Sequence, residues 1–220
     1  MSRWPVTSTG LVPLATERTT AATDLILALV VVGGILWLWR AAPPGWRRAV
    51  WLVALAAFGA SALLGAAAHG LALAGRLPGM LWQALYFLLG MAVALFIAGA
   101  LADWRGEAEA RGKLPALLIV AALFYLATRL TGGDFRVFLV FEGTALVFAL
   151  AVYGALGVRG RAGAGTVAAA MALSLAAGVI QAMSSLSVRL GWEFDHNGLY
   201  HLVQIVGVVV LIRGLAIVLR

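Results

Sequence analysis

Long apolar runs dominate the chain, and short polar or turn-forming segments separate them. Each run suits a helix of about 20 residues, the length that crosses the hydrocarbon core of a bilayer. Because lipid offers no partner to backbone N–H and C=O groups, helices are the expected spanning structure. The pattern therefore predicts an all-α protein, a polytopic seven-transmembrane helix bundle. The predicted helices are Asp24–Arg40, Ala49–Leu73, Met80–Leu101, Leu114–Leu130, Phe135–Leu156, Thr166–Leu190 and Asn197–Leu219.

Polar positions inside these runs predict a polar layer near one end of the bundle. Once the direction of each helix is considered, polar side chains of five helices fall at a similar depth, and the opposite halves are mostly Ala, Leu, Val, Gly and Phe. This distribution favours a cavity that opens at one end. Taken singly, Ser and Gln residues such as Ser61 and Gln204 are also typical of helix–helix contacts, which contribute roughly 0.6 kcal/mol each.

Composition supports a membrane environment. Of the 220 residues, 63% are hydrophobic and only 11% are charged, whereas soluble domains carry about 25% charged residues. The net charge of +7 would suggest nucleic acid in a soluble protein, but the arginines lie in short loops between apolar runs. We therefore expect membrane lipids, and not nucleic acid, as the surroundings. Cysteine is absent, which excludes disulfides and thiolate metal sites.

The basic residues predict an orientation. Ten of the 16 Lys and Arg residues lie in the loops after the first, third and fifth predicted helices and at the C-terminus. Since cytoplasmic loops carry an excess of Lys and Arg, the N-terminus is expected outside and the C-terminus in the cytoplasm. Residues 1–22 are predicted to form a short extracytoplasmic tail, and residues 23–220 the transmembrane domain. The excess of Arg over Lys, with abundant Ala and Gly, suggests a bacterial inner membrane protein.

The three histidines of the chain, His69, His196 and His201, all fall in the polar layer. Three imidazoles with one open position form the zinc site that lowers the pKa of bound water to about 7. His196 and His201 are five residues apart, so His196 must precede the first regular turn, with Asn197 as the helix N-cap. In the alternative interpretation, Asn197, four residues before His201, lines the site. The alternative without metal has His196 on the surface and His201 bonded to Tyr or Glu.

Glu142 lies about two turns inside the fifth predicted helix. An acid at this depth needs a cationic partner, a metal ion or a proton. Arg136 and Arg129 are the partners that depth predicts.

One His late in the second helix and two early in the seventh resemble the CREST superfamily, which includes alkaline ceramidases and progestin and adiponectin receptors. Gly65 stands where that superfamily has a Ser, and the last pair reads HxxxxH instead of HxxxH. The resemblance implies a zinc-dependent hydrolase of an amide or ester bond in a lipid substrate. It implies His69, His196 and His201 as zinc ligands. The catalytic residues expected with them are Glu142 or Asp195 as general base and Ser61 or Tyr200 as oxyanion donor.

Two other classes of function fit the same residues. In an ion- or proton-coupled transporter, Glu142 would titrate while His69 and His201 relay protons. In a haem protein, His69 and His201 would be the axial ligands.

Overall fold

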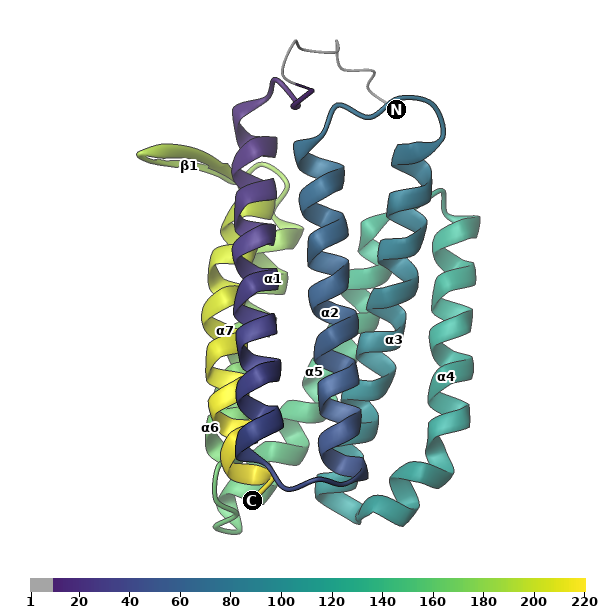
Figure 1. Ribbon diagram of the computed structural model, residues 1–220, viewed down its shortest axis with the longest axis vertical. Helices are drawn as coiled ribbons and strands as arrows, with labels where there is room; N and C mark the ends of the chain where they lie inside the picture. The colour runs from purple at the N-terminus through teal and green to yellow at the C-terminus, as the bar shows by residue number, and fades with distance from the viewer. Residues whose placement is uncertain (1–9) are drawn as a thin grey trace.

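The computed structural model describes residues 10–220. Within this range are seven helices long and apolar enough to cross a membrane (Figure 1), which confirms the predicted all-α seven-helix bundle. The helices are α1 (Ala15–Ala41), α2 (Trp46–Gly70), α3 (Leu77–Arg105), α4 (Glu107–Leu130), α5 (Phe135–Val158), α6 (Ala164–Ala182) and α7 (His196–Val218). Because the number of spans is odd, the two chain termini lie at opposite ends of the bundle. We call the two ends of the bundle the N-terminal end and the C-terminal end.

Six helices form a closed ring, and α4 lies outside it. Each ring helix packs against the next: α1 on α2, α2 on α3, α3 on α5, α5 on α6, and α6 on α7. The ring closes where α7 packs on α1. Helix α4 packs mainly on α3 and more weakly on α5, and it stands at one side of the bundle in Figure 1. The ring brings the first and last helices side by side, which positions the site described below.

Helix α1 begins at Ala15, whereas the sequence predicted its start at Asp24. The polar stretch before Asp24 is helical because it packs beside α7, where Thr20 bonds Asp195 and Thr23 contacts His201. Asp24 is consequently inside the bundle and 4% exposed. Part of the predicted tail thus belongs to α1, and residues 1–9 of that tail lie outside the described residues.

Helix α6 ends at Ala182, so the predicted extension to Leu190 is wrong. The chain continues as an antiparallel hairpin, β1 (Ser187–Leu190) and β2 (Trp192–Asp195), which projects sideways near α1 (Figure 1). Gly191 forms the turn with φ of 78°, a conformation that glycine adopts without steric cost.

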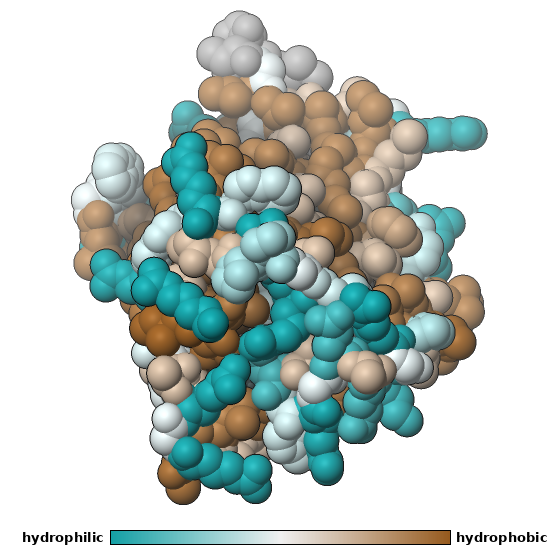
Figure 2. All heavy atoms as spheres, turned by 60° about the horizontal axis from the view of Figure 1, so that its bottom comes forward, coloured by the Kyte–Doolittle hydropathy of each residue, from teal (hydrophilic) through white to brown (hydrophobic). Residues whose placement is uncertain are grey.

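The C-terminal end contains a buried polar cluster. The sequence had predicted that the helix halves at this end are apolar and that Asp103 lies in a loop. Asp103 lies in α3 with a side chain 1% exposed. Arg47 Nε of α2 donates to Asp103 at 2.9 Å, and the Tyr153 hydroxyl of α5 donates to Asp103 at 2.6 Å. The cluster ties three helices together beneath the hydrophilic surface that Figure 2 shows at this end.

Candidate functional site

A cavity of about 810 Å³ lies at the N-terminal end of the ring. Every ring helix contributes to its wall, and so do the α4–α5 connection and the segment after α6. Small-molecule sites typically enclose about 300–1,000 Å³, so the cavity has the size of a ligand site. The structure thus contains the polar cavity that the sequence predicted at one end of the bundle.

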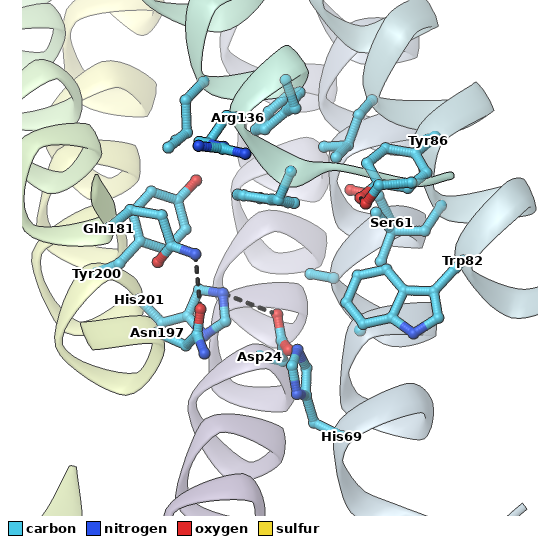
Figure 3. Close-up of a pocket in the computed structure, with 18 of the residues that line it drawn as sticks. Asp24, Ser61, His69, Trp82, Tyr86, Arg136, Gln181, Asn197, Tyr200 and His201 are labelled. Atoms are coloured by element: carbon cyan, nitrogen blue, oxygen red, sulfur yellow. Dashed lines mark hydrogen bonds and ion pairs between the residues drawn. The ribbon is translucent and has the colours of Figure 1, made fainter. Parts of the chain in front are cut away.

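Asp24 is the buried acid of this cavity, and sequence reasoning missed it. Its Oδ1 lies 3.2 Å from Nε2 of His201 (Figure 3), and its Oδ2 is buried without a hydrogen-bond partner among the described residues. Gly65 of α2 makes room for the carboxylate, since a Cβ there would lie 2.7 Å from Oδ2. The overlooked signal was the three- and four-residue spacing of Glu17, Thr20 and Asp24, which marks one helix face.

His201 is held at both ring nitrogens. Its Nδ1 lies 3.2 Å from Thr23 Oγ1. The Thr23 hydroxyl also lies within hydrogen-bonding distance of the Thr19 and Thr20 carbonyls, so its proton goes to one of these carbonyls or to Nδ1 of His201. At 3.2 Å, Nε2 of His201 and Oδ1 of Asp24 share one hydrogen, which either group can carry. The contact therefore places one proton between the imidazole and the carboxyl group.

His69 is anchored by Glu17, which the sequence had placed in the predicted tail. Nδ1 of His69 lies 2.6 Å from Glu17 Oε2. The imidazole also meets the ring of Trp82 edge-on, with centroids 5.4 Å apart and an interplanar angle of 88°. Asp24 lies within electrostatic range of His69, so two acid–histidine pairs stand next to each other in the wall.

Asp195 is the N-cap of α7, and the expectation that Asn197 caps this helix is wrong. Asp195 Oδ1 accepts from the backbone N–H of Gly198 at 3.0 Å and from Thr20 Oγ1 at 3.3 Å. Asp195 is the cap because its carboxylate accepts hydrogen bonds from both the Gly198 N–H and the Thr20 hydroxyl. Asn197 instead lines the cavity and accepts from Gln181 Nε2 at 2.6 Å (Figure 3), as the alternative interpretation proposed.

The three predicted metal ligands, His69, His196 and His201, all line the cavity. Nevertheless, across residues 10–220 no three His, Asp or Glu side chains are placed to hold one metal ion. Protein groups already occupy both nitrogens of His201 and one nitrogen of His69, while Nδ1 of His196 is buried without a partner in the described chain. As arranged, these residues do not fit a three-histidine zinc centre, which stays a prediction from the resemblance.

Ser61 and Tyr200, the predicted oxyanion donors, also lie in the wall. The Ser61 hydroxyl donates to the Phe58 carbonyl of its own helix at 2.7 Å. Tyr200 is 6% exposed, and its ring lies 5.0 Å from that of His201. The catalytic roles of both side chains stay predictions.

Glu142 lines a second, smaller cavity of about 80 Å³ together with Ser174 and Gln204. Neither arginine predicted by depth pairs with it. Arg136 instead binds Asp134, the N-cap of α5, at 2.7 Å. In the described part of the chain Glu142 has no ion pair, although it is only 9% exposed.

Asp134 and Arg136 form a neutral pair at the mouth of the larger cavity. Hydrogen bonds from the Arg136 side chain and backbone hold the pKa of Asp134 below its usual value. The pair therefore adds no net charge to the cavity near neutral pH.

The two cavities lie one below the other along the ring. On α2 the larger is lined from Phe58 to His69, and the smaller from Trp51 to Phe58, nearer the C-terminal end. Phe58, Leu89 and Phe138 line both cavities. These three apolar side chains form the partition between an acid–histidine site and a buried glutamate.

A family model matches residues 19–220, and its description is "family of unknown function (DUF6962)". The chain belongs to this family. No curated protein and no solved structure matches the chain. The DUF6962 match includes Asp24, His69, Glu142 and His201, whereas Glu17 precedes it.

Proposed function

We propose that this DUF6962 protein is a proton-coupled carrier that binds a small polar ligand in the larger cavity. The observation that carries the proposal is the Asp24–His201 contact of 3.2 Å in the wall of a ligand-sized cavity. In this proposal Asp24 and His201 together bind one titratable proton, and they release it when a ligand changes the charge or hydrogen bonding of Asp24. Ionisable residues within membrane spans commonly mark such proton and substrate pathways.

Glu142 is the second proton position of the proposed carrier. It lies beyond the partition, in a cavity with room for a few water molecules. Without a cationic partner, a buried carboxyl is stable as the protonated acid. Movement of the partition residues Phe58, Leu89 and Phe138 would connect the two proton positions, which is how a carrier couples ligand to proton movement.

The proposed orientation places the larger cavity outside the cell, with the C-terminal end in the cytoplasm of a bacterial inner membrane. Basic residues support it, because ten of the 16 Lys and Arg residues fall on the C-terminal side. Arg3, assigned to the other side, lies outside the described residues. Ligand would then enter from outside, past the Asp134–Arg136 pair.

Proteoliposomes with a pH-sensitive dye inside test this function. Methylammonium, acetate, acetamide and glucose are added separately, so that cationic, anionic, neutral amide and sugar ligands are all represented. We expect at least one solute to cause a protein-dependent change in internal pH, and Glu142→Gln to reduce it. If no solute exceeds its effect on protein-free liposomes, the carrier proposal is wrong.

Zinc-dependent hydrolysis of a lipid amide or ester is the second candidate function. Its support is Nδ1 of His196, which is buried and unpartnered among the described residues in the same cavity wall as His69 and His201. Zinc binding would require the imidazoles of His69 and His201 to leave their present partners. Metal analysis of the purified protein beside a His69→Ala, His201→Ala double variant tests it. About one zinc ion per chain, lost in the double variant, would favour the hydrolase over the carrier.

A further inference from the structure

The unpartnered polar atoms of the larger cavity are mainly hydrogen-bond acceptors. In the described chain, Asp24 Oδ2, Gln83 Oε1 and Gln181 Oε1 are buried without partners, and all three residues line this cavity. Among residues 10–220, the one other unpartnered buried polar atom in this wall is Nδ1 of His196. A buried acceptor without a donor is energetically unfavourable, so this wall favours a ligand that brings N–H or O–H groups.

The free oxygen of Gln181 follows from a chain of hydrogen bonds. Asn197 Nδ2 faces a carboxylate oxygen of Asp195 at 3.3 Å, and a carboxylate accepts only. The Asn197 side-chain oxygen therefore faces Gln181, and it accepts a hydrogen bond from the Gln181 amide N–H at 2.6 Å. Oε1 of Gln181 is left as an acceptor in the cavity wall.

The charges of the wall favour a cation. Among the described residues that line the cavity, Arg136 is the one Lys or Arg, and Asp134 already binds it. Asp24 has no Lys or Arg partner: His201 faces it, and the nearby His69 has its own acid partner, Glu17. An anionic ligand would find no free Lys or Arg here, whereas a cation could pair with the unpartnered oxygen of Asp24.

Aromatic rings flank the acceptors. Trp82 and Tyr86 line the cavity with ring centroids 6.1 Å apart, and Trp82 also contacts the His69 ring. Aromatic faces attract ammonium groups and pack against the apolar part of an organic ligand. The wall thus offers acceptors, one open carboxylate oxygen and an aromatic surface in the same space.

We infer that the larger cavity binds an organic ammonium ion that carries N–H groups and donates one of them to Oδ2 of Asp24. This inference rests on the proposed carrier function and names its substrate class. As the ammonium binds, Asp24 and His201 together release one proton to water, and the neutral imidazole that remains donates from Nε2 to Oδ1 of Asp24, so one positive charge replaces another. Gly65 maintains the site by leaving room for the carboxylate.

Four ligands that share a phenyl ring test the inference: benzylammonium, benzyl alcohol, benzoate and the larger benzyltrimethylammonium, which has three methyl groups in place of the N–H hydrogens. Binding is measured by calorimetry on the protein in lipid nanodiscs near neutral pH, with empty nanodiscs subtracted. We expect benzylammonium to bind at least about tenfold more tightly than benzyl alcohol. Benzyltrimethylammonium, a cation without N–H groups, should fall between them, and benzoate should bind most weakly. Equal or tighter binding of benzyl alcohol or benzoate to the wild-type protein overturns the inference.

Asp24→Asn supplies the matched test of the binding group. It should remove the preference for benzylammonium over benzyl alcohol. Glu193→Gln, which removes the same charge from an exposed hairpin residue at the same end, should keep it. Thermal unfolding of both variants verifies that they are folded. A preference that survives in folded Asp24→Asn protein overturns the assignment to Asp24, and the wild-type ligand series decides the ligand class even if this variant does not fold.

The outcome also separates the ligand class from the carrier function. Preferential binding of benzylammonium without proton movement in the proteoliposomes retains the ligand class and rejects the carrier. Proton movement driven by acetate, acetamide or glucose, but not by methylammonium, retains the carrier and rejects the ligand class.

Discussion

Asp24 and Asp103 are both buried aspartates near opposite ends of the bundle, and their surroundings differ. Asp103 accepts from the Arg47 guanidinium and the Tyr153 hydroxyl. Asp24 faces only an imidazole at one oxygen, and its other oxygen is unpartnered among the described residues and borders a large cavity. A carboxylate with its charge and lone pairs satisfied stabilises the fold, whereas one left incomplete is available to a proton or ligand.

Removal of the satisfied carboxylate should have the largest effect on stability. We expect Asp103→Asn to lower the free energy of unfolding by about 3 kcal/mol, because it leaves the Arg47 charge without a partner. Thermal unfolding in detergent measures the change. The control is Glu107→Gln at an exposed i,i+4 pair with Arg111, where a loss below about 0.5 kcal/mol is expected. Unchanged unfolding of Asp103→Asn would remove the contrast between the two aspartates.

Glu142→Gln should separate proton movement from ligand binding. The substitution keeps the shape of the side chain but removes the titrating group, so ligand-driven proton movement should fall by about 100-fold, which corresponds to about 2.7 kcal/mol. Benzylammonium affinity should stay within about twofold of wild type, because Glu142 lies beyond the partition. A parallel loss of binding and proton movement would show that the two cavities do not act separately.

Gly65→Ala should sharpen the comparison by disturbing Asp24 without removing its charge. The new Cβ would lie 2.7 Å from Asp24 Oδ2, so the carboxylate must shift. We expect an approximately tenfold loss of benzylammonium affinity, or about 1.4 kcal/mol. Gly33→Ala in α1, where a Cβ meets no atom within 4 Å, is the control and should bind normally. Normal binding by Gly65→Ala as well would contradict the placement of the ligand at Asp24.

The smallest effect is expected at Asp134. Since Arg136 lowers the pKa of this exposed carboxyl, the stabilising pair is fully present above the pKa of Asp134 in the unfolded chain and is lost as pH falls through the lower, folded-state pKa. Arg136→Gln should therefore raise the pKa of Asp134, slightly lower thermal stability near neutral pH, and make that stability less sensitive to acid. Thermal unfolding of both proteins from neutral to acidic pH measures the difference, and identical profiles would contradict it.

The sequence predicted the number of spans, their approximate limits and a polar cavity at one end. Predictions failed where local composition and tertiary packing disagreed. The stretch before Asp24 is polar enough to resemble a tail, yet it is helical because it packs beside α7 and bonds Asp195 and His201. The serines after Ala182 lie among apolar residues and resemble the end of a helix, yet they lead into a hairpin.

The thickness of the bilayer sets how long an apolar run must be to span it, and the length of each run can be read directly from the sequence. The sequence by itself therefore determined that this protein has seven spanning helices. It also identified His69, His201 and Glu142 as residues of interest, because polar groups are costly in lipid. Only the tertiary structure decided which groups meet. Closure of the ring by α1 and α7 places Asp24 against His201, and the missing side chain of Gly65 makes room for the carboxylate. Such contacts depend on helix order and rotation, which hydrophobic length does not specify.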